Sequence, residues 1–426
     1  MYENLAILTA FIFLYSISSK GLEHTPINGA ILFISFGLIF GPLGLGLLTL
    51  EVKAEGLSIL AEIALALVLF TDAANANLSV LKKRFHLPQR LLLIGLPLTI
   101  LLGFGTGVLV FGGLTLMEIA ILATILAPTD AALGKAVVTN ESVPAAIREG
   151  LNVESGLNDG ICVPILFVFL ALAASSGTDA NTPMLALKLV SQEIGIGIGV
   201  GVGLTLLGMW LLKIFADREW ISETWRQLPV VALAVSCFAL SQQLGGSGFI
   251  ASFVGGLLFG GVEKGHKHKL MLAAEGTGDT FALITWVIFG AAVIGQSFKN
   301  FSWEIVLYAF LSLTVVRILP VFLALAGMKL RTTEKLFIGW FGPRGLASIV
   351  FAVIVFNKHL PGSVTIASTV VFTIILSIVA HGLSANPLVS ALSARIRSSG
   401  INTIRKNFCK PQRCIKNDGR GNKLGS

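Results

Sequence analysis

Residues 150–174 read GLNVESGLNDGICVPILFVFLALAA, a long apolar run headed by two carboxylates, Glu154 and Asp159. An apolar segment of about 20 residues has the length of an α-helix that crosses a lipid bilayer. A charged side chain inside such a helix is costly and indicates a functional position by default. The stretch therefore predicts a membrane helix whose carboxylates serve a purpose.

The composition of the whole chain indicates a polytopic α-helical membrane protein. Of its 426 residues, 54% are hydrophobic and 13% are charged, and the mean hydropathy is +0.84. Soluble domains carry about 25% charged residues, and a β-barrel would show alternation over about 10 residues instead of long apolar runs. The sequence predicts thirteen spans, at 4–19, 27–48, 57–76, 90–112, 117–137, 151–174, 185–212, 228–243, 247–262, 279–296, 303–326, 334–356 and 364–391.

The net charge of +8 follows the loops and does not indicate nucleic-acid binding. With the N-terminus outside, 24 Lys and Arg residues fall in cytoplasmic loops and in the tail 395–423, whereas the opposite loops hold three, Lys53, Lys299 and Lys358. This is a positive-inside distribution. We expect a multi-pass protein of the cell inner (plasma) membrane with a cytoplasmic C-terminus, and a first span at the N-terminus in place of a signal peptide.

The four cysteines do not predict a metal site or a disulfide framework. Cys162 and Cys237 lie in apolar runs, where a small buried thiol is expected. Cys409 and Cys414 lie in the basic tail without a partner pair or a nearby histidine.

Two spans carry proline next to a charge. Span five contains ILAPTDAALG (125–134) and span twelve contains GWFGPRGLASIV (339–350). Thirteen spans divide into six, one linker and six, so these two are related as in an inverted repeat. A proline inside a helix kinks or opens it, and a simple kink is the alternative for either one alone. The matched pair, with Asp130 and Arg344 beside the prolines, predicts unwound segments that line a cavity near the bilayer midplane.

The oxygen atoms near these breaks are suited to a small hard cation. Ser155 and Asp159 lie four residues apart and share a helix face. Together with Asp130 and the carbonyl of Thr129, they can supply the several oxygen ligands that such ions need. The alternative is that Asp130 and Asp159 pair with arginines for structure alone.

Other charges in the spans have alternative roles. Glu154 faces away from Asp159, so we expect a buried salt bridge with Arg317 or Arg344. Arg344 can instead neutralise the carbonyl end of a half-helix. Asp72 either contributes to the site from span three or is interfacial. Three further residues are Glu62 and Asp279, as cavity residues, and His381, as a pH-sensitive group or a hydrogen-bonded interfacial histidine.

Four motifs, LAPTDAAL, NVESGLNDG, VVRILPVF and FGPRGLAS, occur in an order and spacing that resemble the NhaP/NHE branch of the monovalent cation:proton antiporters. The resemblance covers nearly all of residues 1–391. It implies an NhaA-like fold with two inverted six-helix repeats and crossed discontinuous helices. Spans 4–6 and 11–13 would form the ion-translocation core, spans 1–3 and 8–10 a dimer scaffold, and span 7 a linker, followed by a short basic tail at 392–426.

The same resemblance implies roles for individual residues. Asp159 matches the carboxylate that binds the ion and the proton, with Asp130, Ser155 and the Thr129 carbonyl as co-ligands. Asn158 occupies the position that is Asp in electrogenic relatives, which implies electroneutral 1:1 exchange.

The resemblance also implies a structural ion pair, and the chain departs from the family pattern at one stretch. Glu154 matches the structural glutamate, and Arg317 matches its arginine partner. Where relatives often read LLFE, this chain reads LFTDAA, so the role of Asp72 as an acidic contributor stays open.

The expected function is the exchange of Na⁺, or Li⁺, for protons by alternating access, with a role in pH homeostasis. No cofactor is expected; the partners are monovalent cations, protons, the lipid bilayer and a second copy of the chain, without nucleic acid. A K⁺/H⁺ antiporter would use the same site. A cation channel would need a continuous pore, and an enzyme would need a nucleophile with a base, a metal cluster or a cofactor motif, none of which the sequence offers.

Overall fold

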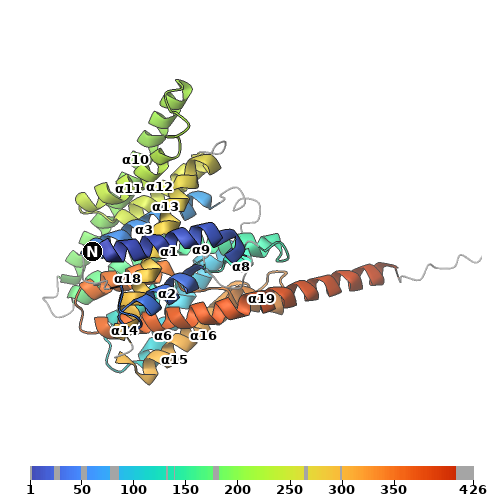
Figure 1. Ribbon diagram of the computed structural model, residues 1–426. Coiled ribbons are helices and arrows are strands. Elements are labelled where there is room, and N and C mark those ends of the chain that lie inside the picture. The colour runs from blue at the N-terminus through green and yellow to red at the C-terminus, as the bar shows by residue number, and fades with distance from the viewer. Residues whose placement is uncertain are drawn as a thin grey trace, which may run out of the picture.

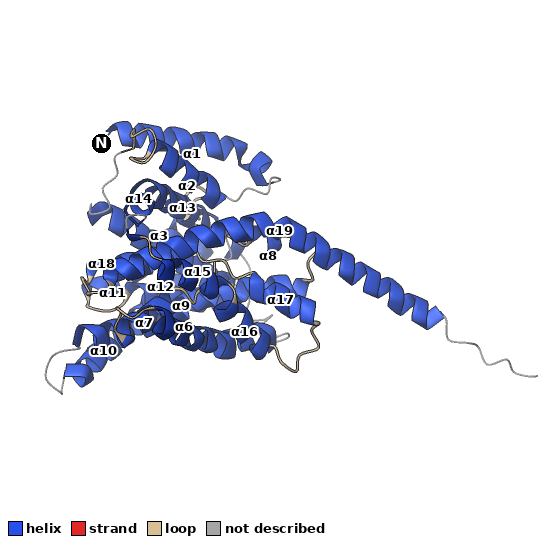
Figure 2. Cartoon of the chain, turned by 90° about the horizontal axis from the view of Figure 1, so that it is seen from below, coloured by secondary structure: helices blue, strands red, loops and turns tan. Residues whose placement is uncertain are grey.

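The computed structural model describes residues 2–23, 29–48, 55–76, 86–130, 133–138, 140–175, 182–262, 267–297 and 300–408. Within these ranges the regular structure is entirely helical (Figure 2). Several residues of the predicted loops and of the tail lie outside the described ranges: Lys53, Lys82, Lys83, Arg84, Lys264, Lys299, Cys409, Cys414 and the rest of the tail beyond residue 408.

The helices follow one another along the chain as the hydropathy pattern predicts. The first part contains α1 (Tyr2–Glu23), α2 (Gly29–Phe40), α3 (Glu55–Asn75), α5 (His86–Arg90), the π-helix η1 (Leu91–Gly95), α6 (Leu96–Val110), α7 (Leu116–Ile125), α8 (Lys135–Val138) and α9 (Ala145–Ser175). The second part contains α10 (Thr182–Asp217), α11 (Leu228–Gln243), α12 (Gly248–Val262), α13 (Lys267–Ile288), the π-helix η2 (Phe289–Val293), α14 (Ile294–Ser297), α15 (Trp303–Leu313), α16 (Val315–Ala324), α17 (Thr332–Trp340), α18 (Leu346–Asn357) and α19 (Ser363–Phe408). Each predicted span contains at least part of one of these helices.

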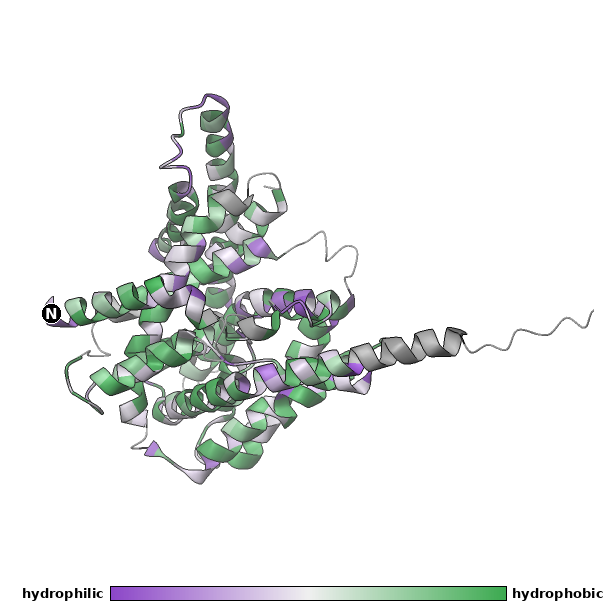
Figure 3. Cartoon of the chain, turned by 45° about the vertical axis from the view of Figure 1, so that its right-hand side comes forward, coloured by the Kyte–Doolittle hydropathy of each residue, from purple (hydrophilic) through white to green (hydrophobic). Residues whose placement is uncertain are grey.

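Among the described residues, seven helical stretches are long and apolar enough to cross a membrane, which makes the chain a multi-pass membrane protein. They are Tyr2–Leu22, His86–Val110, Ala145–Ala174, Leu187–Asp217, Leu270–Val293, Trp303–Ala324 and Ser363–Arg395. Five shorter apolar helices, α2, α7, α11, α12 and α18, have 10–17 residues. Apolar residues run along most of the helices (Figure 3), as expected for a protein whose solvent is lipid.

Both predicted helix breaks are present, and both are openings of the helix instead of simple kinks. After α7 ends at Ile125, residues 126–130 are not helical, and between α17 and α18 residues 341–345 are not helical. Pro128 and Pro343 lie inside these two segments, where a proline cannot donate the hydrogen bond that would continue the helix.

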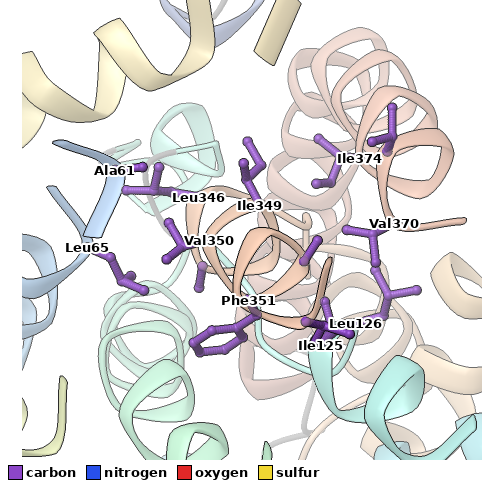
Figure 4. Packing of buried hydrophobic residues seen from close by; sticks show 14 of the residues in the cluster. Ala61, Leu65, Ile125, Leu126, Leu346, Ile349, Val350, Phe351, Val370 and Ile374 are labelled. Carbon is purple, nitrogen blue, oxygen red and sulfur yellow. The ribbon is translucent and has the colours of Figure 1, made fainter. Parts of the chain in front are cut away.

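The main core surrounds α18. Its residues Ile349, Val350 and Phe351 are buried, and they belong to a cluster that extends to α7, α19 and α3 (Figure 4). Elsewhere, α3 and α12 approach closely because Gly256 and Gly260 of α12 have no side chain. A Cβ atom at either glycine would overlap the carbonyl oxygen of Phe70 or of Ala74. The last part of α19 extends away from the bundle (Figure 1).

Candidate functional site

The two non-helical segments contact each other at their centres. The amide of Asp130 donates a hydrogen bond to the carbonyl of Pro343 at 2.8 Å. The carboxylate of Asp130 accepts from the amide of Leu346, the first residue of α18, at 3.1 Å, and from the amide of Leu133 at 3.3 Å. A carboxylate is favourable at a helix N-terminus, where the free amides carry partial positive charge. Asp130 therefore caps the second half-helix of the other broken segment.

Arg344 makes the opposite contact. Its guanidinium Nη1 donates to the carbonyls of Ala127 and Pro128 at 2.8 and 2.9 Å, just beyond the C-terminal end of α7. Its side chain is fully buried. Of the two roles expected for Arg344, the structure has the neutralisation of a carbonyl end. The expected alternative in which Arg344 forms the salt bridge with Glu154 is therefore wrong.

Glu154 pairs with Arg317, as one of the expected alternatives has it. Arg317 Nη1 and Nη2 donate to the two carboxylate oxygens of Glu154 at 2.6 and 2.8 Å, and each side chain is 1% exposed. The two donors and two acceptors form a bidentate pair, which fixes geometry as well as charge. This pair joins α9 to α16, and both carboxylate oxygens of Glu154 are bound by Arg317.

Helix α9 is fastened to the first break by two polar contacts. Ser155 Oγ donates to the carbonyl of Thr129 at 2.6 Å, and Asn158 Nδ2 donates to Thr129 Oγ1 at 2.8 Å. Asp159 lies one turn beyond Ser155 and is 8% exposed. In the described part of the chain, Asp159 Oδ1 and Asn158 Oδ1 are buried and have no hydrogen-bond partner.

The surroundings of Asp159 are acidic. The negative charges of Asp130 and Asp72 both act on it. Asp72 comes from α3, and a Cβ atom at Gly156 of α9 would lie 3.3 Å from its Cβ and carbonyl oxygen. Asp279 in turn acts on Asp72. Carboxylate, hydroxyl and carbonyl oxygens thus lie beside an unpartnered carboxylate oxygen, which is the donor chemistry of a small hard cation.

Glu62 lies in another place. It lines a cavity between α3, α9, α10 and α18, together with Glu193 and Lys358. Along α3 it is ten residues, or about 15 Å, from Asp72. Glu62 is therefore a cavity residue, as expected, but of a cavity apart from Asp159.

Residues 7–391 match the family model described as the transmembrane sodium/hydrogen exchanger. The chain belongs to the sodium/hydrogen exchanger family. The family expected from the four motifs is thereby confirmed.

Two named relatives are distant from this chain in sequence. The K(+)/H(+) antiporter NhaP2 of Shewanella oneidensis is 24% identical over 382 residues, which are 89% of this chain and 64% of that protein. The Na(+)/H(+) antiporter of Schizosaccharomyces pombe is 25% identical over 300 residues, 63% of this chain and 64% of that protein. This chain thus spans less than two thirds of the length of these relatives.

The fold of this chain is shared with a solved structure. The sodium proton antiporter MjNhaP1 from Methanocaldococcus jannaschii has a TM-score of 0.72 at 23% identity, over 89% of this chain and 98% of that chain. At this identity the likeness shows the fold alone. The expected helical antiporter fold agrees with it.

The sequence did not identify two serines that hold the breaks, and it left two alternative roles for His381. Ser348 Oγ donates to the carbonyl of Ile125 at 2.8 Å, and Ser377 Oγ accepts from the amide of Arg344 at 2.8 Å. His381 is 3% exposed, and its Nε2 lies within hydrogen-bond distance of the Trp340 carbonyl at the end of α17, so it is a buried, hydrogen-bonded histidine. A polar residue in an apolar span is the only signal these positions give, and it does not distinguish them from other serines.

Proposed function

We propose that this member of the exchanger family is a monovalent cation/proton antiporter in which Asp159 binds the ion and the proton alternately. One observation carries the proposal. Asp159 is buried beside two broken helices with a free carboxylate oxygen, whereas Glu154 is matched by Arg317 and Asp130 caps a helix end. The charge of Asp159 is left for a transported cation or proton to neutralise.

The exchange follows from competition for one carboxylate. A cation bound by Asp159, Asp130, Ser155 and the Thr129 carbonyl favours the ionised carboxylate, and a proton displaces it. A buried charge without a partner is costly to move through the membrane. The core therefore crosses only when Asp159 carries a cation or a proton, so that one gradient drives the other without ATP or a cofactor. The family consists of transporters and not of enzymes.

We propose Na⁺ as the cation, with Li⁺ as a second substrate and with K⁺ as the alternative. The relatives support both readings, because one is named a K(+)/H(+) antiporter and another a Na(+)/H(+) antiporter. With the neutral Asn158 beside Asp159, exchange would be electroneutral at one cation per proton.

The architecture belongs to the same proposal. Thirteen spans form two inverted repeats, with spans 4–6 and 11–13 as the moving core and spans 1–3 and 8–10 as the scaffold of a homodimer. The two broken segments, seven spans apart, and the close glycine contacts between α3 and α12 support this division. The protein would lie in the cell inner membrane with its N-terminus outside, serving pH homeostasis.

Proton flux in sealed proteoliposomes tests the function. Na⁺, Li⁺ and K⁺ are added separately to wild type, to Asp159→Asn and to the matched control Glu193→Gln, whose carboxylate lines the other cavity. We expect cation-dependent proton movement in wild type and control and its loss in Asp159→Asn. Flux that is unchanged in Asp159→Asn would contradict the site, and current without proton movement would indicate a channel.

A further inference from the structure

His381 of α19 bridges the two ends of the second break. Its Nε2 lies 2.8 Å from the carbonyl oxygen of Trp340, the last residue of α17. Its Nδ1 lies 3.2 Å from Ser377 Oγ, which accepts the amide of Arg344 at 2.8 Å. The imidazole also stacks on the indole of Trp340, with ring centroids 5.2 Å apart and planes at 30°. The non-helical residues 341–345 are thus held between one ring and one hydroxyl.

The two ring nitrogens face three oxygen atoms. A neutral imidazole has one N–H donor and one acceptor nitrogen. When Nε2 carries the proton, it donates to the Trp340 carbonyl, and Nδ1 can accept from the Ser377 hydroxyl. The hydrogen bonds then run in one direction, from the Arg344 amide through the Ser377 hydroxyl and the His381 ring to the Trp340 carbonyl.

A second proton would change this pattern. Nδ1 also lies 2.7 Å from the backbone carbonyl oxygen of Ser377. If Nδ1 is also protonated, it donates to that carbonyl and can no longer accept from the Ser377 hydroxyl, so the ring no longer orients the hydroxyl whose oxygen accepts from the Arg344 amide. The charged groups that act on the ring are Arg344 from the break and Arg317 from α16, both positive. From α17 and the break, the aromatic rings of Trp340 and Phe341 face it.

We propose that His381 is a positioning residue of the exchanger, active when neutral and released by protonation. Its neutral form fixes the backbone of Arg344, whose guanidinium holds the carbonyls of Ala127 and Pro128. The next residue is Thr129, whose carbonyl is a proposed cation ligand. His381 therefore acts on cation affinity through Arg344 without touching the ion. The inference rests on the proposed function for the ligand that it positions.

Three substitutions separate the two contacts of the ring. In H381Q the side-chain amide reaches as far as Nε2 and can donate to the Trp340 carbonyl, but it does not titrate. In H381N the shorter amide reaches only Ser377, and H381L removes both contacts. His359→Gln is the matched control, because His359 is exposed beyond the end of α18.

Transport kinetics across the acidic to alkaline range give the first readout. At alkaline pH we expect H381L to raise the cation KM about tenfold with a smaller effect on kcat, as expected for lost hydrogen bonds. In H381Q, the cation KM at alkaline pH should stay within about threefold of the wild-type value. On acidification, the KM of H381Q should rise less than that of wild type, because the glutamine does not titrate. An unchanged KM in H381L, or a wild-type pH profile in H381Q, would overturn the proposal.

Tryptophan fluorescence gives a readout that does not depend on transport. A protonated imidazole quenches an indole stacked on it, so the wild type should lose emission on acidification. The change should be absent in Trp340→Phe and in H381Q and present in His359→Gln. Quenching without any cation-driven proton movement would sink the proposed antiport but leave the titrating contact intact. Antiport without quenching would sink the role of His381.

Discussion

Separating Glu154 from Arg317 should be severely destabilising. The two residues form a bidentate pair with donor–acceptor distances of 2.6 and 2.8 Å, and each side chain is 1% exposed. Removing one partner of a buried pair leaves an unpaired charge, which costs about 3–5 kcal/mol of the free energy of unfolding. An exposed ion pair would cost less than about 1 kcal/mol. Arg317→Met should reach the upper part of this range, because it leaves the Glu154 carboxylate without its two donors.

The double variant provides the sharper number. Replacing both charges, with Glu154→Gln and Arg317→Met together, leaves no buried charge at this place. We expect it to be more stable than Arg317→Met alone, with a coupling of about 2 kcal/mol in a double-mutant cycle. Denaturant titration of the purified protein in detergent measures the free energies. Lys213→Met, at an exposed position of α10, is the control and should stay within about 0.5 kcal/mol.

Two results would refute this reasoning. A loss below about 1 kcal/mol in Arg317→Met would mean that solvent reaches the pair and screens its charges. Additive losses in the double variant would mean that the two residues act independently.

Three further changes test the site. In Gly345→Ala the new Cβ would overlap the carboxylate of Asp130, so we expect a loss of about 1–3 kcal/mol in thermal unfolding and impaired flux, whereas Gly112→Ala, in open space, should do neither. Asn158→Asp adds a charge that moves with the core, so its exchange should respond to an imposed membrane potential while that of wild type should not. Ser155→Ala removes a hydrogen bond to the carbonyl at the first break, so the cation KM measured in proteoliposomes should rise about tenfold.

Local chemistry made much of this site predictable. Proline in an apolar span kinks or opens a helix, but Pro164, Pro320 and Pro387 lie inside continuous helices, so it was the matched pair of prolines with a charge beside each that located the breaks. A buried glutamate needs a cation, which limited the partner of Glu154 to the arginines in the spans. The choice between Arg317 and Arg344 could not be made in this way, because it depends on how α9 packs against segments far along the chain.

The burial of individual side chains and their tertiary contacts were harder to predict. Hydropathy ends the last span at residue 391, whereas α19 continues to Phe408, and hydropathy also did not predict that His381 is buried. The capping of α18 by Asp130 joins residues 216 positions apart. Sequence periodicity gives the face of a helix but not its neighbour, so such a contact requires the tertiary structure.

The charges at the two breaks explain why the segments are found together. Asp130 follows the C-terminal end of α7, where a negative charge is unfavourable, and Arg344 precedes α18, where a positive charge is unfavourable. Each charge is suited to the other segment, and there the structure places it: Asp130 on the amide of Leu346 and Arg344 on the carbonyls beyond α7. Because each charge is unfavourable at its own helix end and favourable at the other, each broken segment needs the other one beside it. The two charges are thereby committed to helix ends, and it is Asp159, with its free oxygen, whose charge depends on the transported ion.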